Sequence, residues 1–317
     1  MKVVLLAGGV GGAKMAEGLA AIVERDLTVI VNTGDDLELH GLTIWPDHDT
    51  VAYTLAGLDD EVRGWGLRGE SWTVMDRLEE FGEREWFRLG DKDLATHIWR
   101  TDRLRAGGRP TEVALELAAA MGIEPRILPM ADEPVRTEVH TDDGWLEFQE
   151  YFVHRHQEPT VHEVRFRGVA TANATPEVLA AIARAETIVI APSNPVVSID
   201  PILAVPGVRP AIEEARARGI PVVAVSGIVG GKALKGPADR MLASLGEEVS
   251  ALGVARRYAR RISHFVLDRV DEALEPAIRA LGVETLVTDT IMTSDESRAR
   301  LAEEVLRFSG SPAPTSR

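Results

Sequence analysis

The sequence contains no cysteine among its 317 residues. This absence excludes a disulfide-stapled scaffold, a thiolate nucleophile, a zinc site built on cysteine and a cysteine-ligated iron–sulfur cluster. No stretch approaches the ~20 consecutive apolar residues of a membrane-spanning helix, and the apolar start at residues 3–7 is shorter than a signal-peptide core. We therefore expect a cytoplasmic protein without a membrane segment.

Basic residues are scarce, because 35 Lys and Arg stand against 50 Asp and Glu, for a formal net charge of -15. Phosphodiester backbones and anionic lipid surfaces repel such a chain, so we expect neither nucleic acid nor a membrane as partner. A phosphorylated small molecule remains compatible if backbone N–H groups, a few cations or a metal ion neutralise it locally. Aromatic residues make up only 5% of the chain, yet five of the six tryptophans lie between residues 45 and 99.

Short apolar runs that precede amphipathic helical patterns dominate both ends of the chain. Residues 3–7 and 27–31 flank the first helical pattern, in which Met15, Leu19 and Val23 share a face. Further apolar runs lie at 187–191, 221–225, 264–267 and 285–287, with helical patterns at 206–218, 250–261, 271–281 and 294–308. This alternation predicts an α/β fold with a doubly wound, mostly parallel sheet, Rossmann-like and three-layered.

The middle of the chain has a different pattern. Helical patterns at 50–58, 71–80, 94–104 and 111–121 precede a hairpin and an alternating strand at 161–167. The hairpin is indicated by the turn signal DDG (142–144), which is flanked by the expected strands at 136–141 and 145–153. We interpret residues 56–168 as an inserted helical and β-hairpin subdomain. Residues 1–55 and 169–317 then form the nucleotide-binding core.

A glycine-rich segment, GGVGGAK (8–14), joins the first predicted strand to the first predicted helix. Glycines let a phosphate approach the backbone, and a helix N-terminus offers free N–H groups. The segment is not a Walker A loop, because Ala13 precedes Lys14 and Met15 replaces the Ser or Thr. It also lacks the third glycine and the ribose-binding acid of a dinucleotide fingerprint. It predicts a phosphate site, with a plain tight turn as the alternative.

Acidic residues and histidines follow the second predicted strand, in NTGDD (32–36), HGL (40–42) and PDHDT (46–50). They share the carboxyl edge of the sheet with the glycine segment, and open α/β folds bind ligands there. The carboxylates suit Mg²⁺, which prefers oxygen ligands, or one of them suits a base acting on a hydroxyl group. The alternative is a solvated loop in which Asp49 caps a helix starting at Thr50.

Three further polar segments carry less specific signals. GDKDLATH (90–97) either contributes to the site or caps a helix with Asp91 or Asp93. APSNP (191–195) ends a strand and suits a nucleobase edge or ribose, unless it is only an Asx-type turn. SGIVGGKALKGP (226–237) is a second candidate phosphate cradle. These segments predict a phosphorylated, nucleotide-like ligand and a divalent metal, but no particular reaction.

Taken in order, the segments resemble the CofD/FbiA family, the 2-phospho-L-lactate or phosphoenolpyruvate transferases of coenzyme F-420 biosynthesis. The matching segments cover essentially the whole chain: GGVGGAK (8–14), NTGDD (32–36), HGL (40–42), PDHDT (46–50), GDKDLATH (90–97), SNPVVSIDPIL (193–203), GIVGGKALKGPADR (227–240) and DTIM (289–292). One departure is Gly227, where the family usually has proline.

The resemblance implies a phosphoryl-transfer reaction. A guanosine-diphosphate-linked acid, lactyl or enolpyruvyl, would donate its acid-bearing phosphoryl group to the terminal ribityl hydroxyl of the deazaflavin Fo. GMP would leave, Mg²⁺ would be required, and the product would be F-420-0 or its dehydro form. No motif distinguishes the two donors. A homodimer is also expected on this resemblance.

The resemblance assigns acceptor-side roles to a few residues. Asp49 and Arg88 match the positions that contact Fo, and His40 and Gly41 are expected beside them. Asp49 would orient or deprotonate the ribityl hydroxyl, and Asp35 is the second residue expected to be catalytic.

On the donor side, Asp35 and Asp36 are the expected Mg²⁺ contacts. The residues expected around the nucleotide and its phosphates are Gly9, Gly11, Gly12, Lys14, Thr33, Ser193, Asn194, Gly230, Gly231 and Lys232. Their task would be charge neutralisation and in-line placement of the reacting groups.

A non-catalytic protein of the same fold is the alternative. YvcK-like regulators resemble this family and bind nucleotide sugars, but their second loop is rich in Asp, Gly and Ser. The NTGDD segment, followed by HGL and Asp49, favours the transferase.

Overall fold

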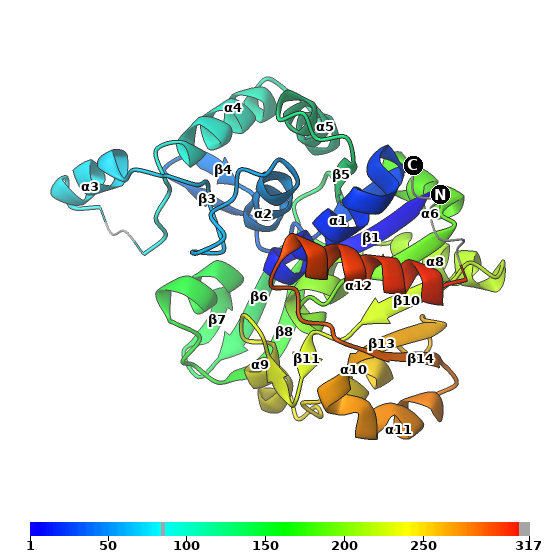
Figure 1. The fold of residues 1–317 in the computed structure, drawn as a ribbon. Helices are drawn as coiled ribbons and strands as arrows, with labels where there is room; N and C mark the ends of the chain where they lie inside the picture. Colours follow the sequence, from blue (N-terminus) through cyan, green and yellow to red (C-terminus); the bar gives the residue numbers. More distant parts are fainter. Residues whose placement is uncertain (84–85, 311–317) are drawn as a thin grey trace.

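The centre of the protein is a parallel sheet of seven strands, seen in a computed structural model that describes residues 1–83 and 86–310 (Figure 1). In spatial order the strands are β14 (Glu284–Thr288), β13 (His264–Asp268), β10 (Val222–Val225), β9 (Thr187–Ile190), β1 (Val3–Ala7), β2 (Leu27–Val31) and β5 (Arg126–Pro129). All adjacent pairs are parallel. The predicted α/β fold with a doubly wound sheet is confirmed.

Helices cover both faces of this sheet. Val3 and Leu5 of β1 pack with Met15 of α1 in one hydrophobic cluster, whereas Val4 and Leu6 belong to another. Successive side chains of a strand point to opposite faces, so one short strand supplies both cores. The first face is covered by α1 (Gly9–Val23), α2 (Pro46–Leu55) and α12 (Asp295–Phe308), and the second by α6 (Pro176–Arg184), α7 (Asp200–Ala204), α8 (Val208–Ala217) and α10 (Ala251–Tyr258).

The division of the chain predicted from the sequence differs from the structure at one strand. β5 lies inside the range 56–168 assigned to the insertion, but it pairs with β2 in the central sheet. Ile127 and Leu128 are buried on opposite faces of that sheet, one in each cluster. An apolar run this short gives no clear strand signal in the sequence. The other boundaries of the two units stay a prediction.

The segment between β2 and β5 carries most of the predicted insertion. It contains the hairpin of β3 (Leu37–Leu39) and β4 (Leu42–Ile44), then α2, α3 (Thr73–Glu80), α4 (Asp93–Arg105) and α5 (Pro110–Ala120). Leu37, Ile44, Met75, Leu89 and Leu94 form a small core that holds the hairpin to α3 and α4. Figure 1 shows α3 at the far end of this segment, away from the central sheet.

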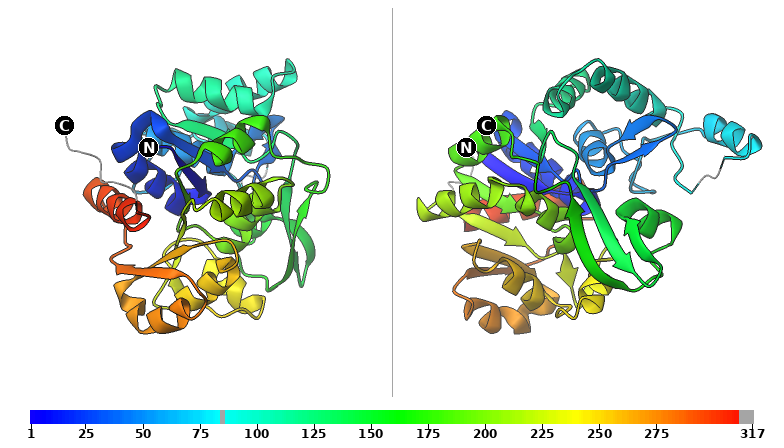
Figure 2. Two further views of the ribbon diagram at one scale, coloured as in Figure 1. Left: turned by 90° about the vertical axis from the view of Figure 1, so that its right-hand side faces the viewer. Right: turned by 180° about the vertical axis from the view of Figure 1, so that it is seen from behind.

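A second, antiparallel sheet follows β5, with the order β7-β6-β8, and Figure 2 shows it beside the central sheet. Its strands are β6 (Arg136–Thr141), β7 (Gly144–Glu147) and β8 (Val161–Arg167). The predicted hairpin is confirmed, but its second arm ends at Glu147 and not at Val153. The chain then forms a π-helical segment, Glu150–His154, which buries Tyr151 beside Phe148. An apolar run in the sequence alone does not show whether its side chains are buried by a strand or by a helical segment.

The predicted helices of the second half are also present, with shifted bounds. The pattern at 271–281 divides into a 3-10 turn (Arg269–Leu274) and α11 (Glu275–Arg279), and α12 begins with a capping box of Ser294 and Ser297. The structure adds α9 (Ala238–Ser244) and the short hairpin of β11 (Ile228–Val229) and β12 (Lys232–Ala233).

Over the described residues, no single helix has the length and apolar character to cross a membrane. Only Pro195–Ala204 and Val208–Ala217 taken together reach that length, and they are bent by 86°. Ile202 and Ile212 of this pair are buried in the core.

Candidate active site

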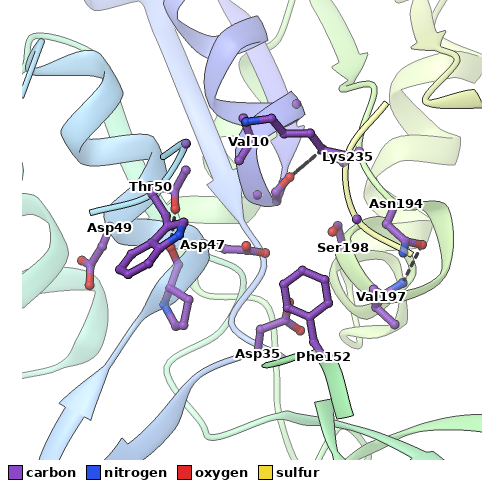
Figure 3. Close-up of a pocket in the computed structure, with 18 of the residues that line it drawn as sticks. Val10, Asp35, Asp47, Asp49, Thr50, Phe152, Asn194, Val197, Ser198 and Lys235 are labelled. Carbon is purple, nitrogen blue, oxygen red and sulfur yellow. Dashed lines mark hydrogen bonds between the residues drawn. The ribbon is translucent and has the colours of Figure 1, made fainter. Parts of the chain in front are cut away.

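A cavity of about 890 Å³ lies at the carboxyl edge of the central sheet. The segments that follow β1, β2, β9, β10 and β14 all reach it, as the fold class predicts. Figure 3 shows Asp35, Asp47 and Asp49 along one side, with Asn194, Ser198 and Lys235 across from them. The insertion and the segment that follows β7 supply much of the remaining wall.

The glycine segment enters the cavity as the first turn of α1, because the helix begins at Gly9. Gly9 and Gly11 line the cavity, whereas Gly12 is buried behind them. A Cβ at Gly11 would lie 2.3 Å from the backbone oxygen of Pro192, and one at Gly12 would lie 2.8 Å from Cβ of Ala7. Close packing therefore requires these two glycines whether or not a phosphate binds.

Two lysines, Lys14 and Lys235, bring positive charge to this end of the cavity. Nζ of Lys14 donates a 2.7 Å hydrogen bond to the backbone oxygen of Met292. Burial, followed by the charges of Arg298 and Lys235, lowers the pKa of Lys14. An anion between the two ammonium groups would relieve that repulsion.

The second predicted phosphate cradle lies elsewhere than expected. Gly230 and Gly231 form the turn of the β11–β12 hairpin with φ of 57° and 75°, and N of Gly230 donates to Asp271. Neither they nor Lys232 lines the cavity, which the same segment reaches through Lys235 and its neighbours. The hairpin explains the difference, because it turns residues 230–232 outward.

Asp35 and Asp47 are buried carboxylates on the cavity wall. Oδ2 of Asp47 accepts a 2.9 Å hydrogen bond from Nδ2 of Asn32, and Oδ1 of Asp35 has no hydrogen-bond partner among the described residues. Burial raises the pKa of Asp47 to about 6. Burial and the charge of Asp47 raise the pKa of Asp35 well above its usual value. Asp47 was not among the predicted site residues, although it lies in the segment PDHDT (46–50).

Asp36 and Thr33 lie behind this wall. Both are buried, but neither lines the cavity. Burial raises the pKa of Asp36, and the charges of Arg136 and Arg100 oppose the shift. The structure therefore does not bring Asp36 to the predicted metal site or Thr33 to the predicted phosphate site.

His40 and Gly41 are also outside the cavity. They form the turn of the β3–β4 hairpin, with φ of 51° and 71°. The backbone oxygen of Gly41 accepts a 2.6 Å hydrogen bond from Nη2 of Arg105. This contact holds the turn against the end of α4, away from the predicted acceptor position.

Asp49 lies inside the first turns of α2, because the helix begins at Pro46. It therefore does not cap a helix that starts at Thr50, and its carboxylate faces α4, where Arg100 donates to Oδ1. Burial is the largest single effect on the pKa of Asp49 and opposes its ionisation. The charge of Arg100 and smaller contributions from His48 and His97 together outweigh burial and hold the pKa of Asp49 well below its usual range. Sequence reasoning missed Arg100.

GDKDLATH gives the start of α4, but its caps are not the predicted ones. Asp91 accepts hydrogen bonds of 3.0 Å from the backbone N of Thr73 and Val74, so it caps α3. Glu70 accepts from the backbone N of Lys92 and Asp93 at the start of α4. Asp93 is thus left free to face the cavity.

Asp49, Asp93 and His97 bring ligand atoms within 4.8 Å of one another, close enough for a metal ion. The hydroxyl of Tyr53 donates to Oδ1 of Asp93, and Nε2 of His97 lies 3.2 Å from Oδ2. Arg100 already supplies a positive charge beside Asp49 and His97, which disfavours a second cation. We interpret this cluster as a hydrogen-bonded network organised around Arg100.

Ser193 and Asn194 line the cavity, but their side chains hold the backbone. Oγ of Ser193 donates a 2.8 Å hydrogen bond to the oxygen of Gly8, and Oδ1 of Asn194 accepts one of 2.9 Å from the N of Val196. The Asx-type turn considered from the sequence is therefore present. It keeps the strand end open to a ligand.

Aromatic side chains from two separate segments form another part of the cavity wall. Trp65, Trp72, Trp86 and Phe87 come from the insertion, and Phe148 and Phe152 follow β7. Phe148 and Phe152 are stacked, with centroids 5.5 Å apart and planes at 12°. The guanidinium of Arg88 lies 5.3 Å from the ring of Trp72 and is paired with Asp76. A flat aromatic ligand fits such a wall.

Comparisons with known proteins agree over the whole length. The family described as "2-phospho-L-lactate transferase CofD" matches residues 3–304. The "2-phospho-L-lactate transferase" of Methanosarcina mazei is 40% identical over 96% of this chain and 99% of its own. The "Phosphoenolpyruvate transferase" of Kitasatospora aureofaciens is 42% identical over 96% of this chain and 97% of its own.

The chain belongs to the CofD family. It is a transferase, as predicted from the resemblance of its sequence segments.

A solved structure supports the fold of this CofD-family protein. A member of the UPF0052 family from Bacillus halodurans superposes with a TM-score of 0.64, covering 96% of this chain and 98% of its own. At 15% sequence identity this likeness shows the fold alone. The alternative of a non-catalytic regulator has no support from the relatives near 40% identity, which carry transferase names.

Proposed function

We propose that this CofD-family protein transfers a phospholactyl or phosphoenolpyruvyl group from a guanosine-diphosphate-linked donor to the ribityl hydroxyl of Fo. The observation that carries the proposal is one cavity with three chemically distinct parts. Lysines and helix N–H groups, buried carboxylates and an aromatic wall all line it. A charged nucleotide donor and a flat acceptor need these parts side by side.

The donor diphosphate would lie between the start of α1 and Lys235. Gly9 and Gly11 leave backbone N–H groups of the first helical turn near the cavity, and a helix N-terminus favours anions. Lys14 and Lys235 add two cations on the same side. This local positive charge would allow an anionic donor to bind although the chain as a whole is acidic.

Asp35 and Asp47 fit the Mg²⁺ that the family resemblance implies. Both offer carboxylate oxygens to the cavity, and the buried Oδ1 of Asp35 has no partner among the described side chains. Oxygen donors of this kind suit Mg²⁺. When bound, the ion would supply positive charge to the phosphoryl oxygens. Asp47 therefore replaces Asp36 in the predicted pair.

The acceptor ring would lie along the aromatic wall, with Arg88 and Asp49 at its ribityl end. In the transfer, the hydroxyl oxygen forms a bond to the acid-bearing phosphorus, and the bond from that phosphorus to the bridging oxygen of GMP breaks. GMP keeps the bonding electrons, and the hydroxyl proton passes to Asp49 Oδ2 and on to solvent. Asp49 is a weak base, so it mainly orients the hydroxyl, as carboxylates do in other phosphoryl transfers.

The test is an assay of the purified protein with Mg²⁺, Fo and each donor in turn. We expect a phosphodiester product and one GMP per turnover. Absence of any mass change on Fo with both donors would refute the proposal. The ratio of the two rates identifies the acid. Light scattering on the same sample tests the predicted homodimer.

A further inference from the structure

Helix α4 presents three polar side chains along one buried face. Asp93, His97 and Arg100 follow one another at helical spacing, and Arg100 is fully buried at 0% exposure. They pack against Asp49 and Tyr53 of α2. Two helices thus share a polar network beside the cavity.

The partners of Arg100 fix its plane as well as its position. Nη2 donates to Oδ1 of Asp49, and Nη1 lies 3.2 Å from the backbone oxygen of Thr43. The guanidinium carbon lies 4.4 Å from the ring centre of Trp45. Contacts on three sides prevent the planar guanidinium of Arg100 from rotating. The ammonium group of a lysine could not make the same set of contacts.

The hydrogen atoms of the network can be assigned from these contacts. Nη1 of Arg100 lies 3.3 Å from Nδ1 of His97, and a guanidinium only donates, so Nδ1 accepts. The proton of His97 is then on Nε2, 3.2 Å from Oδ2 of Asp93. Tyr53 donates to the other oxygen of Asp93.

One carboxylate oxygen of Asp49 also remains to be accounted for. Oδ2 of Asp49 is buried and has no hydrogen-bond partner among the described residues, and Asp49 lines the cavity. Nδ1 of His97 lies 3.7 Å from this oxygen, but it carries no proton to donate because it accepts from Arg100. Oδ2 is therefore available to a hydroxyl group of a ligand.

We propose that Arg100 is a positioning residue for the acceptor: it fixes Oδ1 of Asp49 so that Oδ2 receives the reacting hydroxyl. This inference rests on the proposed function. Arg100 acts through Asp49 and not on the donor, because Asp49 is the cavity carboxylate it contacts in the described structure. Its loss should lower kcat and leave the KM of the donor unchanged.

The test is a double-mutant cycle between Arg100→Gln and Asp49→Asn, with kcat and both KM values measured. Each single variant should lower kcat by about 100-fold, and the double variant should be no slower than Asp49→Asn alone. Removing Arg100 alone strands a buried charge, so Arg100→Lys is measured as well. It keeps the charge and should still lose at least about tenfold in kcat, because the fork is absent.

A matched control lies one turn further along α4. Arg103 also stacks on a tryptophan, with its guanidinium 4.2 Å from the ring of Trp99, but it pairs with Glu116 outside the cavity. Arg103→Gln should leave kcat and KM unchanged. Free guanidinium ion should restore part of the activity of Arg100→Gly.

Three results would overturn the inference. The first is a fall in kcat from Arg100→Gln as large in the Asp49→Asn background as in the wild type. The second is a lowered melting temperature of Arg100→Lys with unchanged kcat. The third is an inactive wild type, which contradicts the proposed function and with it the acceptor. With an active wild type, either of the other two results contradicts the inference alone.

Discussion

Nδ2 of Asn32, at the end of β2, donates a 2.9 Å hydrogen bond to Oδ2 of Asp47 in the first turn of α2. The same carboxylate lies so close to Gly8 that a Cβ there would be 2.6 Å from it. Oδ1 of Asn32 accepts from the backbone N of Gly34 at 2.8 Å. The segments after β1 and β2 and the start of α2 therefore meet at one buried carboxylate.

Asp47→Asn should stabilise the metal-free protein while lowering its activity. The pKa of Asp47 is raised to about 6 in the folded state, against an ordinary value near 4. Protonated Asp47 therefore adds to the free energy of unfolding. This contribution is fully present below the ordinary pKa and is lost as pH rises through about 6. Above that pH the buried charge costs about 3 kcal/mol, which corresponds to a few degrees of melting temperature.

Thermal unfolding with a chelator at pH 5 and pH 8 checks this prediction. We expect Asp47→Asn to melt higher than the wild type at pH 8 and to show a much smaller difference at pH 5. Turnover at pH 8 should fall by about 100-fold or more. Asp102→Asn, at an exposed position on α4, is the control and should change neither quantity. An equal melting temperature at pH 8 would contradict the assigned burial cost.

Asp35→Asn and Asp36→Asn should differ in Mg²⁺ binding, because Asp35 lines the cavity and Asp36 lies behind its wall. Mg²⁺ binding to the folded state raises the melting temperature by mass action. The cavity geometry predicts that Asp35→Asn abolishes this rise and that Asp36→Asn keeps it, because only Asp35 of the two lines the cavity. Loss of the rise in Asp36→Asn alone would return the metal to the pair predicted from the sequence.

Much of the fold was predictable, because it depends on patterns that persist over many residues. The buried strands of the central sheet are continuous apolar runs, and the helix at 294–308 begins with a polar cap that is visible in the sequence. β5 was not predictable in the same way. Its four residues are a strand because β2 and two helical layers surround them, and that environment is tertiary.

The candidate site was predictable as a set of segments but not as a set of side chains. The sequence placed the segment of Lys232 and Lys235 at the sheet edge, but only the β11–β12 hairpin decides which lysine faces the cavity. Arg100 had no motif around it, and its importance depends on the distance between α4 and α2. Such relationships arise from tertiary packing, which the spacing of residues along the sequence does not reveal.

Lys14→Met and Lys235→Met should each raise the KM of the donor by about tenfold, since hydrogen bonds to charged groups contribute roughly 1.5–3 kcal/mol. Lys232→Met is the matched control in the same segment, because Lys232 is exposed and does not line the cavity. Steady-state kinetics at saturating Fo measures the effect. An equal loss in Lys232→Met would show that the hairpin closes over the donor.

Trp72→Ala should raise the KM of Fo by about tenfold with little change in the KM of the donor, because stacking of a flat ring on an aromatic side chain contributes about 1–3 kcal/mol. Trp72 also contacts Arg88, so its removal has two consequences. Phe152→Leu separates them, since it keeps an apolar side chain and removes a flat face that stacks on Phe148. Trp145→Ala is the control, because Trp145 stacks on Arg165 at 3.8 Å on the small sheet and does not line the cavity. If Trp145→Ala and Phe152→Leu change the KM of Fo equally, the acceptor ring does not bind at this wall.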